Sequence, residues 1–339
     1  MKKIILISLS IIVLAAAFIS WKIFGPTVSM PEGKYFYIRT GENYLEVKKD
    51  IAEKGIVSGF WFEQLAKRMK YDRSVKPGRY EIKKGMSLFE LVRMLRNGNQ
   101  SPVNMVITKL RTKEDLARRA GSLFEFDSLQ MINFLNNNDS LSKYDVDSNT
   151  VMTAVFPDTY TYFWNSTPQK VFQKLFAESE KFWTEERKQK ASEHGLTTKK
   201  SYILASIIEE ETNSKTDKGN IASVYLNRIE KGMPLQADPT VKFALKDFSL
   251  KRIYQKHLQT QSPYNTYITK GLPPGPICTP SVETIDALLN SPKTNYLYFV
   301  ASSAFDGSHV FTSSYDEHLK KAKEYQKALN ELEAARKNK

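Results

Sequence analysis

The chain has 339 residues, of which 41% are hydrophobic, so it can build two or three domains with cores of their own. Its formal charge of +13 comes from lysines that are spread along the chain and mixed with acids, which argues against nucleic acid as a partner. Cys278 is the single cysteine and the four histidines are scattered, which excludes an intramolecular disulfide and zinc-ligand spacing, so we expect no metal and no cofactor.

The chain opens with an uncharged run from Ile4 to Trp21 that follows two lysines, Lys2 and Lys3. At helical rise, these 18 residues nearly match the hydrocarbon thickness of a bilayer. Because basic residues favour the cytoplasmic side, we predict a cytoplasmic tip and a transmembrane anchor within residues 1–25, with the rest of the chain exported. A cleaved signal peptide is the alternative, and it also exports the domain.

Residues 35–120 contain a weak repeat of strand, turn and helix. Each copy places an isoleucine in a short strand and an acid eight residues later: Ile38 with Glu46, Ile82 with Glu90, and Ile107 with Asp115. Ser87 and Thr112 stand where a helix N-cap belongs. This pattern predicts a small α+β module.

The middle copy, residues 76–98, is the clearest of the three. A Pro-Gly turn, a strand and a glycine turn lead into a helix with one apolar face, which ends at Asn97-Gly98. This copy resembles the LysM-like segment that follows the anchor in one family of peptidoglycan enzymes. The resemblance implies a LysM-like membrane-proximal domain at residues 26–103 that binds glycans containing N-acetylglucosamine. A spacer domain without a ligand is the alternative.

The second half of the chain begins with a predicted strand at residues 159–164 and an amphipathic helix that starts at Thr167-Pro168. A further helix, with Thr197 or Thr198 as N-cap, contains the stretch ILASIIEEET, residues 203–212.

Three consecutive glutamates close this apolar run. At 100° per residue, Glu211 falls inside the face formed by the isoleucines and Leu204, and Glu210 falls at its edge. Glu209 falls on the face of Ala205 and Ser206, where a bulky ligand could lie against the helix.

Three interpretations follow for these carboxyl groups. A solvated helix end suits Glu210, a structural carboxylate that accepts hydrogen bonds from a facing loop suits Glu211, and a general acid beside an open cleft suits Glu209. The pattern alone leaves Glu209 and Glu211 open as the acid, because a buried glutamate is also the kind whose pKa rises.

Two later stretches, residues 227–240 and 264–267, carry groups suited to binding sugars. Amides, carboxylates and hydroxyls can form hydrogen bonds with the acetamido and hydroxyl groups of a sugar, and tyrosine adds an apolar face. In the first stretch we predict a short extended segment that contains Gln236, Asp238 and Thr240. The second is a loop at residues 264–267, for which a rigid structural role is the alternative. The candidate substrate-binding or supporting residues are Asn227, Arg228, Gln236, Asp238, Thr240, Tyr264, Asn265, Thr266 and Tyr267.

Several long motifs occur in one order along the chain, and together they resemble the YceG-like family of endolytic murein transglycosylases. They are FPDTY at 156–160, LASIIEEET at 204–212, SVYLNRIEKGMPLQADPTVKFAL at 223–245, SPYNTYITKGLPPGPICTPS at 262–281 and NYLYFVA at 295–301, followed by His309.

The resemblance implies that Glu209 is the catalytic residue and that Glu211 supports it. It also implies an α+β protein with one N-terminal transmembrane helix, the LysM-like segment, and a mixed α/β catalytic domain at 104–339. We expect a single-pass protein of the bacterial inner membrane with its catalytic domain outside, acting on peptidoglycan glycan strands. Peptidoglycan synthases or division proteins are the expected partners.

Such an enzyme cleaves between N-acetylmuramic acid and N-acetylglucosamine without water, and the muramyl 6-hydroxyl closes a 1,6-anhydro ring. One carboxyl suffices as acid and then base, so we expect the pKa of Glu209 to lie above the usual value of about 4.3. A muramidase that uses Glu209 with Asp238 is one rival. A catalytically idle glycan-binding scaffold of the division machinery is the other.

Overall fold

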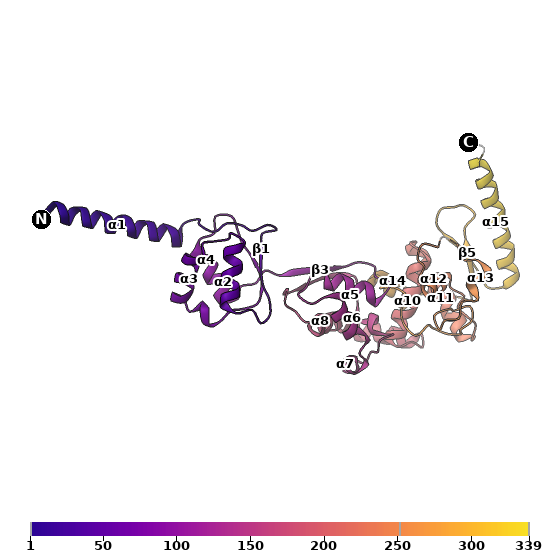
Figure 1. Ribbon diagram of the computed structural model, residues 1–339. Coiled ribbons are helices and arrows are strands. Elements are labelled where there is room, and N and C mark those ends of the chain that lie inside the picture. Colours follow the sequence, from indigo (N-terminus) through magenta and orange to yellow (C-terminus); the bar gives the residue numbers. More distant parts are fainter. Residues whose placement is uncertain (1, 251, 338–339) are drawn as a thin grey trace. The chain divides into compact units, whose positions relative to one another are not determined.

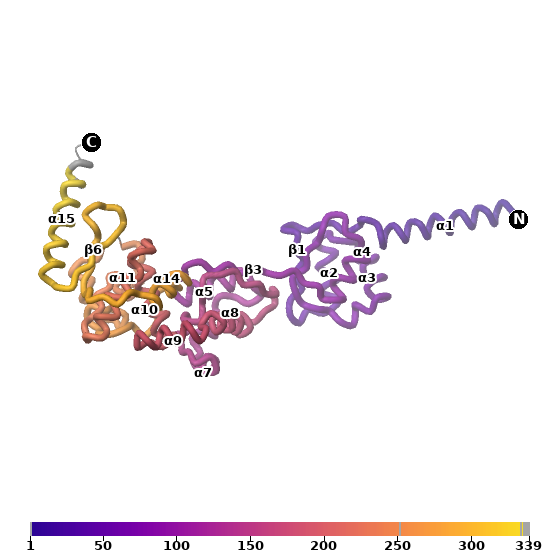
Figure 2. Tube along the Cα trace, turned by 180° about the vertical axis from the view of Figure 1, so that it is seen from behind, coloured from indigo at the N-terminus to yellow at the C-terminus, as the bar shows by residue number. Residues whose placement is uncertain are grey.

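The computed structural model describes residues 2–250 and 252–337, and Figures 1 and 2 show it from opposite sides. The chain forms two compact units. Unit 1 contains the residues up to 105 together with 120–127 and 161–167. Unit 2 contains the remaining segments, 106–119, 128–160 and 168 onwards. The predicted domain boundaries near residues 25 and 103 stay predictions.

The chain begins with α1 (Lys2–Phe24), a helix of 23 residues in which no side chain is fully buried. Within the described part of the chain, α1 is the one helix that is long and apolar enough to cross a bilayer. A signal sequence has the same properties, so this observation agrees with both predicted alternatives.

Unit 1 is built around a short antiparallel pair of strands, with Tyr35 opposite Glu81 and Ile38 opposite Gly78. Helices cover this pair and bury a core of aliphatic and aromatic side chains. The elements are β1 (Tyr35–Ile38), α2 (Tyr44–Glu53), α3 (Gly59–Arg68), a 3₁₀ turn (Tyr71–Arg73), β2 (Gly78–Glu81) and α4 (Leu88–Asn97).

Local capping explains where α4 begins and ends. Ser87 accepts a hydrogen bond from the Glu90 main-chain N–H, and the Glu90 carboxylate accepts one from the Ser87 N–H, which is a capping box. Gly98 follows the helix with φ of 72°, a conformation that glycine adopts without a steric cost. The predicted N-cap and C-terminal glycine are therefore confirmed.

A second two-stranded sheet joins β3 (Val103–Ile107) to β4 (Asp158–Tyr162). The predicted strand at 159–164 is thus present but shorter. After β3, the Thr112 hydroxyl accepts a hydrogen bond from the Asp115 N–H at 3.1 Å, which confirms the predicted N-cap of the next helix.

Unit 2 is mainly helical, and its hairpin of β5 and β6 pairs antiparallel. Before the central helix come α5 (Lys113–Gly121), α6 (Ser128–Asn136), α7 (Asn138–Ser142), a 3₁₀ turn (Val151–Ala154), α8 (Pro168–Phe182) and α9 (Glu185–Glu193). The later elements are α10 (Thr198–Glu211), α11 (Lys215–Glu230), α12 (Asp238–Leu245), α13 (Gln255–Leu258), α14 (Val282–Leu289), β5 (Tyr298–Ala301), β6 (His309–Thr312) and α15 (Tyr315–Lys337).

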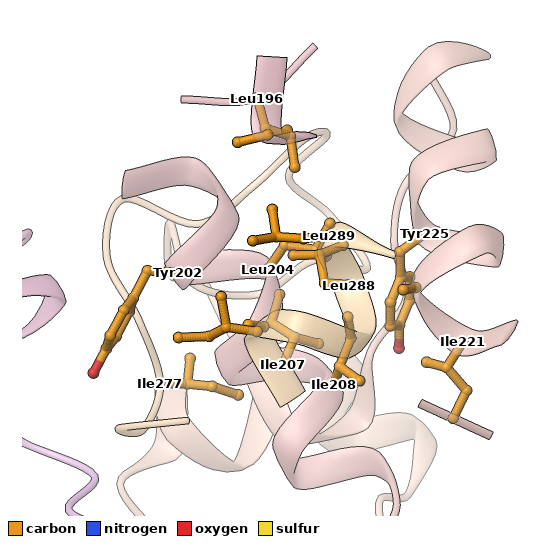
Figure 3. Packing of buried hydrophobic residues seen from close by; sticks show 14 of the residues in the cluster. Leu196, Tyr202, Leu204, Ile207, Ile208, Ile221, Tyr225, Ile277, Leu288 and Leu289 are labelled. Atoms are coloured by element: carbon orange, nitrogen blue, oxygen red, sulfur yellow. The ribbon is translucent and has the colours of Figure 1, made fainter. Parts of the chain in front are cut away.

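The core of unit 2 surrounds α10, which packs against α11 and α14. Figure 3 shows Leu204, Ile207 and Ile208 of α10 among side chains from neighbouring elements. The predicted mixture of helices and strands is confirmed, with two-stranded sheets throughout the described residues. The LysM-like character of unit 1 stays a prediction.

Candidate active site

Helix α10 ends with the three glutamates, and its whole circumference is buried before them. Thr197 is its N-cap and accepts a hydrogen bond from the Lys200 N–H, as predicted. Ala205 and Ser206 are fully buried, and the Ser206 hydroxyl accepts a hydrogen bond from the Ile277 N–H at 3.0 Å. The prediction of an open face of small residues is therefore wrong, because the 277–279 segment packs against that face.

Glu209 reaches beyond this packed face to the start of α14. Its carboxylate oxygen Oε2 accepts hydrogen bonds from Lys218 Nζ at 3.2 Å and from the Ser281 hydroxyl at 3.0 Å. The Thr284 hydroxyl also donates to Oε2. Among the described residues, no hydrogen bond falls on the other oxygen, Oε1. The three donors on one oxygen thus fix the orientation of the carboxylate.

Two helices, α11 and α14, bring these donors together. Lys218 lies in the first turns of α11, and its side chain is only 8% exposed. Ser281 is the N-cap of α14 and Thr284 lies in its first turn. Lys218 Nζ also donates to the Thr284 hydroxyl at 2.6 Å, so the three donors brace one another as well as the carboxylate.

The surroundings of Glu209 favour its ionised form. Burial raises the pKa of the carboxyl, but the Thr284 hydrogen bond, the Lys218 charge and the Ser281 hydrogen bond outweigh burial, so the pKa of Glu209 lies below its ordinary value. The expected raised pKa is therefore wrong for the free protein. The sequence does not reveal the lowered pKa, because the three donors lie up to 75 residues from Glu209 along the chain.

Glu210 is not a solvated helix end. Its side chain is 17% exposed, and its carboxylate pairs with Lys109 at 3.0 Å and Arg111 at 3.1 Å. This ion pair fastens the chain after β3 to the end of α10. Glu210 therefore serves the local structure.

Glu211 has a different environment from Glu209. Its Oε1 accepts a hydrogen bond from the Tyr225 hydroxyl of α11 at 2.6 Å. Burial raises the pKa of Glu211 to about 7, against the Tyr225 hydrogen bond, and the nearby charge of Asp238 raises it further. The structural hydrogen bond expected for Glu211 is present, but its donor comes from a helix instead of a loop.

Asn227 and Arg228 use their side chains to hold the segment that precedes β5. The Asn227 amide donates to the carbonyl oxygens of Thr294 and Tyr296 at 3.0 and 2.9 Å. Arg228 is buried and donates to the Leu297 carbonyl at 2.7 Å. Both residues therefore have supporting contacts within the protein.

The stretch that contains Gln236, Asp238 and Thr240 is not extended throughout. Gln236 is exposed and has a φ of 54°, but α12 begins at Asp238 and includes Thr240. Thr240 is buried and lies 2.8 Å from the Thr266 hydroxyl. The prediction of an extended stretch fails because Pro239, a residue suited to the first helical turn, starts a helix.

The loop at 264–267 combines structural and accessible groups. Asn265 and Thr266 are buried, and the Asn265 amide donates to the carbonyl oxygens of Leu258 and Thr260, each at 2.9 Å. Tyr264 packs against Phe243. The Tyr267 hydroxyl donates to Asp238 Oδ1 at 2.6 Å, which joins the two predicted stretches. The alternative of a structural loop therefore applies to Asn265 and Thr266.

Sequence reasoning missed Lys218, Ser281 and Thr284. Only Ser281 carried a usable signal, since a serine before an apolar run marks a helix N-cap.

A histidine–aspartate pair also went unnoticed in the sequence. His309 Nδ1 lies 2.9 Å from the carboxylate of the buried Asp217, which precedes Lys218 in α11. Across residues 2–250 and 252–337, no group of His, Cys, Asp and Glu side chains could hold a metal ion.

The chain is similar to known proteins over most of its length. The model of the YceG-like family matches residues 36–324. The endolytic murein transglycosylase of Bacillus subtilis is 31% identical over 269 residues, or 75% of this chain and 74% of that protein. The protein of the same name from Streptococcus pneumoniae is 27% identical over 331 residues, which cover 88% of this chain but 58% of that protein. A crystal structure of a YceG-like protein from Listeria monocytogenes, 25% identical, has a TM-score of 0.56 and covers 85% of this chain and 99% of that one.

Proposed function

Because the chain belongs to the YceG-like family, we propose that it is a lytic transglycosylase acting on peptidoglycan. It cleaves N-acetylmuramic acid–N-acetylglucosamine bonds within nascent glycan strands and leaves 1,6-anhydro ends, so it terminates strand elongation. The observation that carries this proposal is the Glu209 carboxyl, which is held at Oε2 by three donors and has no described contact at Oε1.

One carboxyl serves both half-steps of this reaction. The proton on Glu209 passes to the glycosidic oxygen, the bond from C1 to that oxygen breaks, and the oxygen keeps the electron pair. The Glu209 carboxylate then takes the proton of the muramyl 6-hydroxyl while that oxygen forms a bond to C1. No water enters, and Glu209 is protonated again at the end, now with the proton from the 6-hydroxyl.

Lys218, Ser281 and Thr284 have a defined part in this sequence. Their hydrogen bonds to Oε2 stabilise the carboxylate that forms when Glu209 gives up its proton, and they keep Oε1 as the oxygen that faces the sugar. The acid form is needed first, and a bound glycan favours it. A glycan that covers the carboxyl, now 16% exposed, removes its remaining water and raises its pKa.

The remaining site residues divide into two groups. The first offers polar groups to the glycan: it consists of the exposed Gln236 and Asp238, and of Tyr267, whose hydroxyl donates to Asp238. The second group holds the main chain in place through hydrogen bonds, and consists of Asn227, Arg228, Thr240, Asn265 and Thr266.

The protein acts at the outer face of the inner membrane, with α1 as its anchor and a LysM-like domain, residues 26–103, next to it. The length and apolar composition of α1 support this arrangement. Peptidoglycan synthases or division proteins are its proposed partners, since they produce the strands that it cuts.

Mass spectrometry of the products from uncrosslinked glycan tests the reaction type. We expect anhydro-muramyl ends from the wild type and none from Glu209→Gln, which keeps the shape of the side chain but carries no proton to donate. Reducing ends from the wild type would instead support a muramidase that pairs Glu209 with Asp238. Absence of any turnover would support a glycan-binding scaffold.

A further inference from the structure

The end of α1 is part of the packed structure of unit 1. Ile23 packs against the unit 1 core, and Val28 belongs to it with 5% of its surface exposed. The Val28 N–H donates to the Met86 carbonyl at 3.2 Å, and the Ser29 N–H donates to the Ile56 carbonyl at 2.7 Å. The connection between helix and unit is therefore short and hydrogen-bonded, which fixes the surface of unit 1 that lies next to α1.

Aromatic side chains of α3 and α4 lie on that surface. The ring of Trp61 is 6.1 Å from that of Phe18, and the ring of Phe89 is 5.4 Å from that of Phe24. Phe60 is 5.4 Å from Trp61 and is 62% exposed. Figures 1 and 2 both show α3 and α4 on the side of unit 1 that adjoins α1.

The residues of α1 that these rings contact indicate how deep the rings lie in the membrane. The uncharged run ends at Trp21, so a bilayer boundary lies close to that residue. Phe18 precedes Trp21 by three residues, or about 4.5 Å of helix, which puts it at the edge of the hydrocarbon. Trp61, in contact with Phe18, therefore lies at the level of the lipid headgroups or slightly deeper.

Basic side chains accompany the rings. Lys22 Nζ lies 4.9 Å from the Trp21 ring centre, and the Arg93 guanidinium lies 5.5 Å from that of Phe89. Arg93 and Arg96 are exposed and follow Phe89 by four and seven residues, so all three share one face of α4. Aromatic rings beside cations that can extend toward phosphate are typical of side chains at a membrane interface.

We propose that Phe60, Trp61 and Phe89, together with Arg93 and Arg96, form a membrane-docking surface that inserts into the outer headgroup layer beside α1. The inference rests on the proposed anchor. Its occupant is the bilayer because the surface continues directly from α1, and a soluble partner could not reach rings beside Phe18 without entering the lipid. Unit 1 is then held against the membrane by two attachments instead of one, and cannot turn freely about the end of α1.

Spin labels on the full-length protein test this surface in vesicles of phosphatidylethanolamine and phosphatidylglycerol. Cys278 is buried, and Cys278→Ala supplies a background without cysteine. Labels are placed on the docking surface at Phe60→Cys and Phe89→Cys, in the anchor at Ile12→Cys, and on α2 at Leu45→Cys, where the native side chain is 71% exposed. Power saturation then compares the access of oxygen, which enters lipid, with that of a water-soluble nickel complex.

We expect the oxygen-to-nickel ratio at positions 60 and 89 to be several-fold above that at position 45 and below that at position 12. Ratios at 60 and 89 equal to that at 45 would overturn the docking surface, even if position 12 lies in lipid. Low access to both reagents at 60 and 89 would mean that protein covers the rings, and would also overturn it. A water-exposed position 12 would refute the anchor itself, and the docking surface with it, without affecting the proposed chemistry of Glu209.

Discussion

Replacing Lys218 by methionine tests how the environment of Glu209 controls the reaction. Lys218 Nζ lies 3.2 Å from Glu209 Oε2, and the two side chains are 8% and 16% exposed. At an effective dielectric constant of about 20, such a pair attracts by about 5 kcal/mol before desolvation is subtracted. Because desolvation offsets much of that attraction, we expect Lys218→Met to reduce the free energy of unfolding at pH 7 by about 1–3 kcal/mol.

The variant should also change the pH dependence of catalysis. Without the lysine charge the pKa of Glu209 rises, so more of the enzyme holds the proton that the first half-step needs. The alkaline limb of the rate of anhydro-product release should therefore move to higher pH. Lys218→Arg keeps the charge and is the matched control, so its limb should stay close to that of the wild type.

Stability should depend on pH in a related way. The pKa of Glu209 is depressed in the folded protein, so its stabilising contribution is present above the unfolded value of about 4.5 and is lost as pH falls through the folded value. The stability difference between wild type and Lys218→Met should shrink accordingly in urea unfolding at low pH. An alkaline limb that stays in place in the methionine variant would reduce Lys218 to a structural role and refute the reasoning.

The other predictions concern the glutamates and the anchor. Glu209→Gln should fold normally and lose at least about 10³-fold in the rate of anhydro-product release, since the carboxyl acts in both half-steps. The rate of Glu210→Gln should stay within a few-fold of that of the wild type. Equal losses in the two variants would contradict the role of Glu209 as acid and base. Glu211→Ala should lower thermal stability by about 1–3 kcal/mol because the Tyr225 hydroxyl loses its acceptor, while Glu211→Gln should retain most of it. The pKa of Glu211 in the folded protein is raised to about 7, so the wild type loses stability as pH rises from about 4.5 to 7. The free energy of unfolding of Glu211→Gln should therefore be closer to that of the wild type at pH 8 than at pH 5. A stability difference that does not change with pH would contradict this environment for Glu211. Protease added to spheroplasts should remove the domain outside the membrane, and protection, or a mature chain that begins near residue 20, would exclude the tether.

Local features of this protein were predictable because their causes lie within a few residues of one another. The charge-free run of α1 is continuous in the sequence, and the caps at Ser87, Thr112 and Thr197 depend on hydrogen bonds to the next turn. The helical pattern alone left Glu209 and Glu211 open as the acid; the choice of Glu209 comes from the resemblance to the YceG-like family and stays a prediction.

The tertiary structure decided which environment each glutamate occupies. Lys218, Ser281 and Thr284 follow Glu209 by 9, 72 and 75 residues, and no periodic pattern links such distances. Packing of α10 against α11 and α14 therefore lowered the pKa of Glu209, while burial beside Tyr225 raised that of Glu211. The same packing closed the face of Ala205 and Ser206, because a helix in the middle of a core is buried on every side, whatever the size of the side chains that it presents. A sequence therefore indicates a candidate acid, but the proton affinity of that acid depends on charges and donors that only the folded chain brings within hydrogen-bonding distance.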